Sequence, residues 1–441
     1  MSDTAITDLA GIGQAGAKPK RRDIGLKRRY AAESRFRLYG MLAIGLGLLF
    51  LFLLLWSVIS KGYTAFQQTS IDLPITYSEE VISLEDVQQD NRMALIGQIR
   101  DAVSDALVAK TGVDPENRDA VRAAQSLLSQ GATVQIIERL KANPDLIGQT
   151  ETVRFLAHGV VDSTVKGQFN LDMDEARRPV SDLQLQLISA LQEDGSLAKR
   201  FNTGLFTFGA SSRPETAGMG VAIVGSLYMM LIVLVLALPI GVAASIYLEE
   251  FAPKNRLTDI IEVNINNLAA VPSIVFGLLG LAVFINFAGF PRSAALVGGL
   301  VLTLMTLPTI IIATRAALKA VPPSIRSAAL GVGASKMQTV FHHVLPLAAP
   351  GILTGTILGL AQALGETAPL LLIGMVAFVV EYPTTPLDPA TALPVQIFMW
   401  ANEAERAFVE RTSGAIIVLL MFLAVMNITA IILRRRFERR W

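Results

Sequence analysis

The sequence contains no cysteine and only three histidines in 441 residues. The absence of cysteine excludes disulfides, catalytic thiolates and cysteine-based metal sites. The sequence also lacks the GxxxxGK[ST] loop that cradles nucleotide phosphates, since Gly331-Val332-Gly333 is followed by no lysine–serine pair at the required distance. We therefore expect a chain that does not hydrolyse ATP. The adjacent His342 and His343 point about 100° apart on a helix and cannot share one metal ion, so no metal site is predicted.

Apolar residues dominate the composition: 52 % of the residues are hydrophobic and the mean hydropathy is +0.49. Much of the chain must therefore face lipid. The net charge of +1 is the sum of locally opposed regions and gives no sign of a nucleic-acid partner. Six apolar segments are long enough to cross a bilayer core of about 30 Å, and they span residues 38–60, 219–247, 260–287, 294–312, 347–378 and 414–433.

Basic residues fall on one side of these six segments, in the ranges 18–37, 254–256, 315–336 and 434–440. The positive-inside rule then places both termini in the cytoplasm. The long basic leader, without a small-residue cleavage site, favours a retained anchor over a signal peptide. The sequence thus divides into a basic cytoplasmic tail (1–37), a first transmembrane helix (38–60), an extracytoplasmic domain (61–215) and a transmembrane domain (216–441).

Charges return throughout residues 61–215, and no part of this domain is apolar for long enough to span. We expect a mainly helical domain with one helix from Ser83 towards Ala109, a second capped near Asp114, and a third capped by Ser181 and ended by Gly195. Its role is open between a packing cap on the outer face and a docking surface for a binding protein or regulatory partner.

Residues 321–346 predict a helix–glycine–helix hairpin outside the hydrocarbon. Pro322-Pro323 ends the preceding helix, Ser324 can cap a short new one, and Gly333 weakens its continuation. After Leu345-Pro346 the chain stays uncharged as far as Glu366, which indicates that it returns to the membrane.

Glu366 is the sharpest candidate for a functional residue, because an acid inside a span is costly unless it faces the bundle interior or a partner. Gln362 precedes it by one helical turn, and Thr367 adds a hydroxyl. Asn267 of the third span could line the same path or simply hydrogen-bond a neighbouring helix. The alternative for Glu366 is a carboxylate at the membrane surface that holds a helix end.

Two sets of residues resemble a known family. The cytoplasmic loop of ABC importer permeases is similar to this chain at Ser327-Ala328-Ala329, Gly333 and Leu345-Pro346, although Ser327 stands where a glutamate is usual and His343 where an aliphatic residue is usual. PstA-type permeases of phosphate importers are similar in Gly365-Glu366-Thr367-Ala368-Pro369-Leu370-Leu371, in Val271-Pro272-Ser273-Ile274-Val275 and in Leu393-Pro394-Val395-Gln396-Ile397-Phe398. The resemblance covers roughly residues 220 to 441.

The resemblance implies an all-α membrane protein: six transmembrane helices of the ABC importer permease type, with an inserted extracytoplasmic domain, in a bacterial inner membrane. It implies a subunit that imports inorganic phosphate by alternating access and couples to its ATPase through Ser327, Ala328, Ala329, Gly333, Leu345 and Pro346. Gln362, Glu366, Thr367 and Asn267 would line the substrate path. The partners would be a second permease, a dimer of ATP-binding subunits that hold ATP and Mg²⁺, and an external phosphate-binding protein. No cofactor is expected in this chain.

Glu366 would pair with an arginine and orient it, and would not itself bind the anion. Where the PstA-type pattern has an arginine, this chain has Gln362, which removes one positive charge from the proposed path and leaves attraction of the anion to the partner permease. That departure keeps two alternatives open. One is the same machinery with another oxyanion, molybdate or sulfate. The other is a membrane sensor with an outer ligand-binding domain, although the cytoplasmic segments are only short loops and tails.

Overall fold

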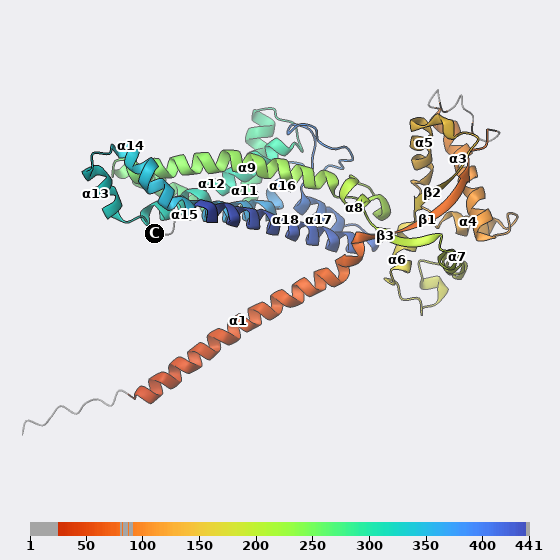
Figure 1. Ribbon diagram of the computed structural model, residues 1–441, viewed down its shortest axis with the longest axis horizontal. Helices are drawn as coiled ribbons and strands as arrows, with labels where there is room; N and C mark the ends of the chain where they lie inside the picture. Colours follow the sequence, from red (N-terminus) through yellow and green to blue (C-terminus); the bar gives the residue numbers. More distant parts are fainter. Residues whose placement is uncertain (1–24, 80–81, 83–86, 88–90, 438–441) are drawn as a thin grey trace, which may run out of the picture. The chain divides into compact units, whose positions relative to one another are not determined.

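The computed structural model describes residues 25–79, 82, 87 and 91–437 and is shown in Figure 1. The chain forms two compact units, which meet between Ser57 and Val58. The first unit holds most of helix α1 (Leu26–Gly62), whose apolar side chains are exposed, as Phe50 and Leu51 illustrate. Exposed apolar side chains on a long helix are expected of a lipid-facing span, and the predicted span 38–60 lies within this helix.

The second unit begins with an inserted domain built on three antiparallel strands. A 3₁₀ turn (Tyr63–Phe66) leads from α1 into β1 (Gln67–Thr76), which pairs with β2 (Thr150–Leu156) on one side and with β3 (Leu197–Phe201) on the other. The register places Ser70 opposite Leu156 and Ile71 opposite Leu197. This sheet was not expected from the sequence.

The second half of β1, residues 71–76, alternates between buried and more exposed side chains, with Ile71, Leu73 and Ile75 all fully buried, and this pattern is typical of a strand with one face on a core. Pro74 interrupts the alternating run without breaking the strand. The Asp72 amide donates towards β3, to the Ser196 carbonyl at 2.9 Å, so position 74 points the same way. The pairing of β1 with β3 stops at Ile71 and Leu197, so no residue of β3 lies opposite position 74. A residue without a backbone N–H is therefore tolerated at this position.

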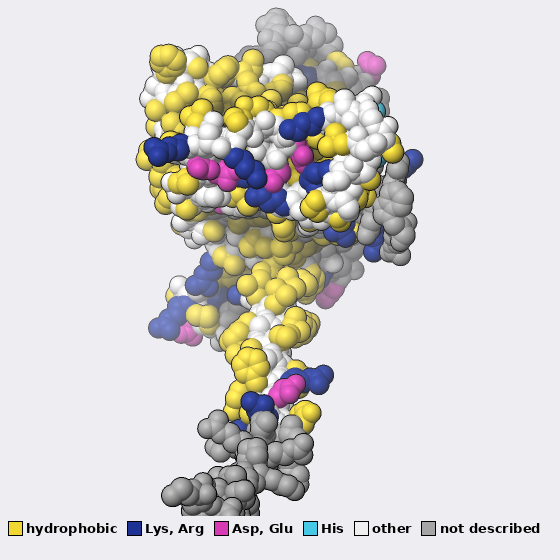
Figure 2. All heavy atoms as spheres, turned by 90° about the vertical axis from the view of Figure 1, so that its left-hand side faces the viewer, with side chains coloured by type: hydrophobic (Ala, Val, Ile, Leu, Met, Phe, Trp, Pro, Cys, Tyr) yellow, Lys and Arg dark blue, Asp and Glu magenta, His cyan; other side chains and the backbone are white. Residues whose placement is uncertain are grey.

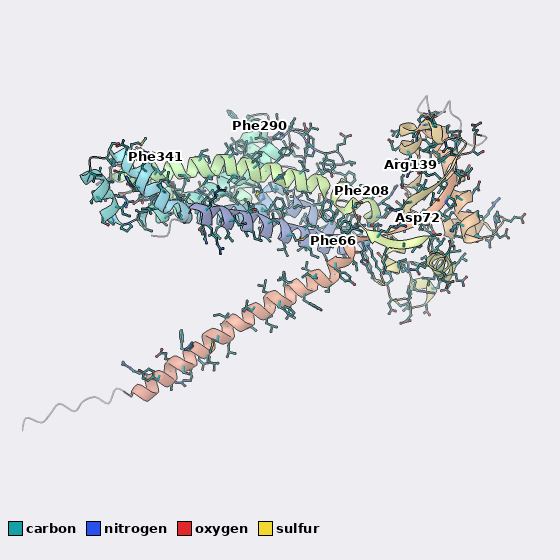
Figure 3. The ribbon with its side chains drawn as sticks, viewed as in Figure 1. Phe66, Asp72, Arg139, Phe208, Phe290 and Phe341 are labelled. Carbon is teal, nitrogen blue, oxygen red and sulfur yellow. The ribbon has the colours of Figure 1, made fainter. Side chains whose placement is uncertain are left out.

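Helices cover the sheet and complete the core of the inserted domain. They are α3 (Arg92–Thr111), α4 (Arg118–Gln125), α5 (Ala132–Ala142), α6 (Gly159–Val165) and α7 (Asp182–Glu193), with short 3₁₀ turns at Pro144–Leu146 and Glu175–Arg177. After β3 come α8 (Gly204–Thr207), whose Leu205 is buried with residues of the bundle, and a 3₁₀ turn at Pro214–Thr216. Figure 3 labels Asp72 on β1 and Arg139 on α5.

The predicted third helix is confirmed, because Ser181 forms a capping box with Gln184 at the start of α7 and Gly195 has a φ of 75°. The predicted second helix begins later than expected, with Asn117 as its cap in place of the Asp114 region. The predicted start of the first helix at Ser83 lies outside the described residues, and α3 begins at Arg92.

The remaining elements form the membrane bundle. They are α9 (Gly220–Ile246) with a π-helical end (Tyr247–Phe251), α10 (Arg256–Ala269), α11 (Ser273–Gly280) with a π-helical end (Leu281–Phe287), α12 (Ala295–Lys319), α13 (Pro323–Gly331), α14 (Lys336–Gln338) with a π-helical segment (Thr339–Val344), α15 (Leu345–Gly365), α16 (Ala368–Leu372), α17 (Leu393–Ala401) and α18 (Ala407–Phe437).

Five helices of the described chain are long and apolar enough to cross a membrane, and a sixth span results if α10 and α11, bent by 100°, count as one. This agrees with the six spans predicted. The most buried of them is α12, which packs against α9 and α15. Small residues let the helices approach closely: a Cβ on Gly351 of α15 would lie 2.6 Å from the Ala317 Cβ of α12.

Candidate functional site

A helical hairpin joins α12 to α15, as the sequence predicts. Helix α13 ends at Gly331, the chain turns at Gly333 with a φ of 88°, and a second capping box at Ser335 starts α14. A side chain at Gly333 would be strained because this backbone region disfavours residues with a Cβ. The sequence predicts that Ser324 caps α13, and this prediction is wrong. Pro322 occupies the cap position, and Ser324 lies inside the first turn.

The residues predicted to couple the chain to an ATPase divide into an exposed and a packed set. Ser327, Ala328 and Gly333 are exposed, and Ala329 is buried against the bundle. Leu345 and Pro346 are partly buried where the π-helical segment continues into α15. The exposed set is accompanied by Leu330, Val332 and Met337, which are 52 %, 86 % and 58 % exposed. The tip of the hairpin thus presents small and apolar side chains.

Arg326 anchors the hairpin, a role that sequence reasoning missed. Its Nη2 lies 2.7 Å from Glu250 Oε1 at the end of α9, and its guanidinium also donates to the carbonyls of Val321 and Leu318 at 2.7 and 2.9 Å. These last two contacts add a side-chain donor to the backbone carbonyls at and just after the end of α12, where the Leu318 carbonyl also accepts from the Val321 amide at 3.3 Å. The hairpin is therefore held to two membrane helices by one side chain.

A second group of charges lies beside this anchor. Arg315 of α12 bonds to Glu262 of α10 and lies 3.5 Å from Glu249, which is also 3.5 Å from the Lys319 ammonium. Figure 2 shows basic and acidic side chains alternating on the end of the bundle that carries α13 and α14. Opposite charges at this end tie α9, α10 and α12 together.

Two of the membrane-spanning segments are broken. The α10–α11 pair bends at Ala270–Pro272, and α15 gives way to α16 at Glu366, whose φ and ψ of −79° and 130° are extended. A Cβ on Gly277 of α11 would lie 2.7 Å from the Pro369 Cα, and one on Gly280 would lie 3.4 Å from Ile373. The two short helices therefore pack side by side in the same direction, with the start of α16 beside the second turn of α11. Broken helices of this kind build substrate sites in many transporters, because they free backbone groups at membrane depth.

The structure brings Glu366 and Thr367 to this junction, where both are partly buried. Gln362 is exposed in the last turn of α15, and it shares no continuous helical face with Glu366 because α15 ends at Gly365. Asn267 is exposed near the end of α10. Within the described part of the chain the Glu366 carboxylate has no hydrogen bond or ion pair.

The inserted domain is joined to the bundle through buried charges. The Lys166 ammonium lies 2.7 Å from Asp162 Oδ2 and 2.9 Å from Glu410 Oε1 in the first turn of α18, and these side chains are 1 %, 6 % and 5 % exposed. Gln168 donates to the other Glu410 oxygen at 2.6 Å. Phe66 and Phe208 mark this seam in Figure 3. Sequence reasoning did not find this network, whose members lie up to 244 residues apart.

Comparison with known families also separates the inserted domain from the membrane bundle: one family matches the N-terminal part of the chain and another matches the C-terminal part. Residues 23–175 match a domain of unknown function, DUF3333, and residues 237–441 match the binding-protein-dependent transport system inner membrane component. A solved structure of the MetNI methionine ABC transporter is 18 % identical with a TM-score of 0.40, covering 50 % of this chain and 98 % of that chain.

Two relatives in other bacteria are permeases by name. A probable ABC transporter permease protein, YqgI of Bacillus subtilis, is 37 % identical over 147 residues, which is 33 % of this chain and about half, 49 %, of the relative. The phosphate transport system permease protein PstA 1 of Mycobacterium tuberculosis is 33 % identical over 229 residues, which is 52 % of this chain and 74 % of the relative. The hairpin, the broken spans and these similarities agree: the chain belongs to the family of inner membrane components of binding-protein-dependent transport systems, the permeases of ABC importers, and PstA-type permeases are among its relatives.

Proposed function

We propose that this chain is a permease subunit of an ATP-driven importer of inorganic phosphate. The observation that carries the proposal is the hairpin, whose exposed tip at Ser327, Ala328 and Gly333 is fixed to α9 and α12 through Arg326. A rigid hairpin with an exposed apolar tip suits a surface that receives motion from another protein. Since α14, the π-helical segment and α15 form one run from Lys336 to Gly365, that motion would reach the break at Glu366 directly.

In this proposal the hairpin and both termini face the cytoplasm, and the inserted domain faces outward. ATP and Mg²⁺ are held by a dimer of partner ATPase subunits, and a second permease completes the path. An external binding protein delivers phosphate to the junction of the broken spans, which opens to each side in turn.

Glu366 acts in this path by orienting a cation, because a lone carboxylate would repel an oxyanion. The second permease would supply the arginine that this chain lacks at Gln362. A path with one fewer positive charge also leaves molybdate or sulfate as the alternative substrate.

The test is the ATPase activity of the reconstituted complex, isolated through this chain and placed in lipid with its binding protein. The binding protein is loaded in turn with phosphate, sulfate or molybdate. Stimulation by phosphate alone is the expected result. Stimulation by another anion changes the substrate and keeps the importer, whereas a chain that brings no ATPase with it returns attention to the membrane sensor.

A further inference from the structure

A groove of two adjoining pockets lies where the inserted domain meets the ends of α1 and α18. The pockets have volumes of about 470 and 590 Å³ and share Gln168, Phe169 and Arg406. One wall is the segment 160–179 of the inserted domain, and the other holds Lys61 and the first turn of α18. Since α1 and α18 both pass the length and hydropathy test for a span, their adjoining ends put the groove at the membrane surface.

Basic side chains outnumber acidic ones in this groove. Five basic residues line it, Lys61, Lys166, Arg177, Arg178 and Arg406, against the two acidic residues Glu405 and Glu410. Three of these residues, Lys61, Arg177 and Arg406, are exposed, and their charged side chains have neither a hydrogen bond nor an ion pair to any described residue. An exposed cation without a partner can bind an anion without first breaking an internal contact.

Of the two acidic side chains in the groove, one is already paired and the other is protonated more readily than usual. Both oxygens of Glu410 are occupied, one by the Lys166 ammonium at 2.9 Å and the other by the Gln168 amide at 2.6 Å. Burial and the neighbouring charge of Glu215 raise the pKa of Glu405 above its usual value. The acidic residues of the same loop, Asp172 and Asp174, do not line the groove.

Buried donors at the floor also favour an anion. Lys166 is 1 % exposed and has two acceptors, Asp162 and Glu410, whereas an ammonium carries three donors, so one N–H is left for a ligand. Arg178 is 9 % exposed, and its Nε is buried without a partner. The hydroxyl-bearing residues Tyr63, Thr64 and Ser163 also line the groove.

We propose that this groove binds a phosphate group at the membrane surface. Guanidinium and ammonium groups beside hydroxyl donors are the set that recognises phosphate oxygens, and arginine matches them in bidentate geometry. The group can come from an anionic phospholipid headgroup or from inorganic phosphate. The site goes beyond the proposed transport function, because binding here needs neither the ATPase nor the binding protein.

The test uses the full chain, delipidated in a phosphate-free maltoside detergent. Inorganic phosphate is titrated calorimetrically. Phosphatidylglycerol, with phosphatidylcholine for comparison, is tested by the shift in thermal midpoint. In the double variant Lys61→Gln/Arg406→Gln, the affinity for the ligand that binds should fall at least about tenfold, because two charge-assisted contacts are lost.

The matched control is Lys199→Gln/Arg213→Gln, which removes the same charge from exposed positions of the second unit that do not line the groove. Both doubles change only exposed side chains, so the unliganded midpoint should stay within about 2 °C of the unmodified chain. Binding of inorganic phosphate that only the groove variant loses supports the site with the free anion as its ligand. A phosphatidylglycerol shift that only the groove variant loses supports it with a headgroup as its ligand. The absence of binding by both ligands, or equal losses in the two doubles, overturns the proposal.

Discussion

Replacement of Lys166 by methionine should strongly destabilise the seam between the inserted domain and α18. The ammonium is 1 % exposed and lies between two carboxylates, Asp162 and Glu410, that are 6 % and 5 % exposed. Methionine keeps most of the side-chain volume and removes the charge, so two carboxylates stay buried without their cation. Breaking a buried ion pair in this way costs about 3–5 kcal/mol. At about 2–4 °C per kcal/mol for a domain of this size, the thermal midpoint should fall by about 6–20 °C.

The assay is thermal unfolding of the purified chain in detergent, with hydrogen exchange of α6 to show that the loss starts at the seam. The matched control is Arg139→Met, which breaks a more exposed ion pair to Glu151, 42 % and 33 % exposed, expected to contribute at most about 1 kcal/mol. Adding Glu410→Gln to Lys166→Met should restore part of the midpoint, because one buried carboxylate then loses its charge. A fall no larger than that of the control, or a double variant less stable than Lys166→Met alone, would refute the reasoning.

Three further changes test other parts of the chain. Gly333→Asp places a side chain where φ is 88° and should uncouple ATP hydrolysis from uptake in the reconstituted complex; coupling that survives intact would show that the hairpin turn is not needed. Glu366→Gln should preserve assembly and abolish uptake of labelled phosphate, and normal uptake would remove Glu366 from the path. Asp72→Asn tests acid stability: a hydrogen bond from Arg200 lowers the pKa of Asp72, so its stabilisation is present above the unfolded pKa of about 3.9 and is lost as the pH falls through the lower folded value. Unfolding midpoints between pH 5 and 2 should therefore fall less steeply in Asp72→Asn than in the unmodified chain, and parallel curves would contradict this assignment.

The membrane helices could be predicted from the sequence because each is a long apolar segment, and length alone decides whether such a segment spans. The hairpin was also predictable, since its prolines and Gly333 act on the local backbone. The sheet of the inserted domain was missed because Pro74 interrupts the alternating run of β1, and proline argues against a central strand. Only the pairing with β3, which ends before position 74, explains why proline fits there.

Contacts between distant residues could not be predicted in the same way. Arg326 and Glu250 lie 76 residues apart, and each alone looks like a charge that keeps a helix end in water. Their pairing depends on where α9 and α12 pack, which the sequence of either helix does not determine. The same holds for Glu366, which was predicted as a candidate site, whereas its position beside the α10–α11 break depends on the packing of α11 against α16.

The two alternatives for the inserted domain, a packing cap and a docking surface, differ in what α18 must transmit. At one end α18 holds the inserted domain through Glu410, and near the other end its Arg434 donates to Thr354 of α15 at 3.2 Å. Helix α15 continues through the π-helical segment into the hairpin. A cap would need only the first of these contacts, because its purpose ends at the outer face. One helix bonds to the inserted domain at its first turn and to the hairpin-bearing helix near its last, so a displacement of the inserted domain that α18 follows as a rigid helix would also reach α15. If the inserted domain is a docking surface, this arrangement gives an event on it a hydrogen-bonded route along α18 to the hairpin, whereas a packing cap makes no use of the second contact.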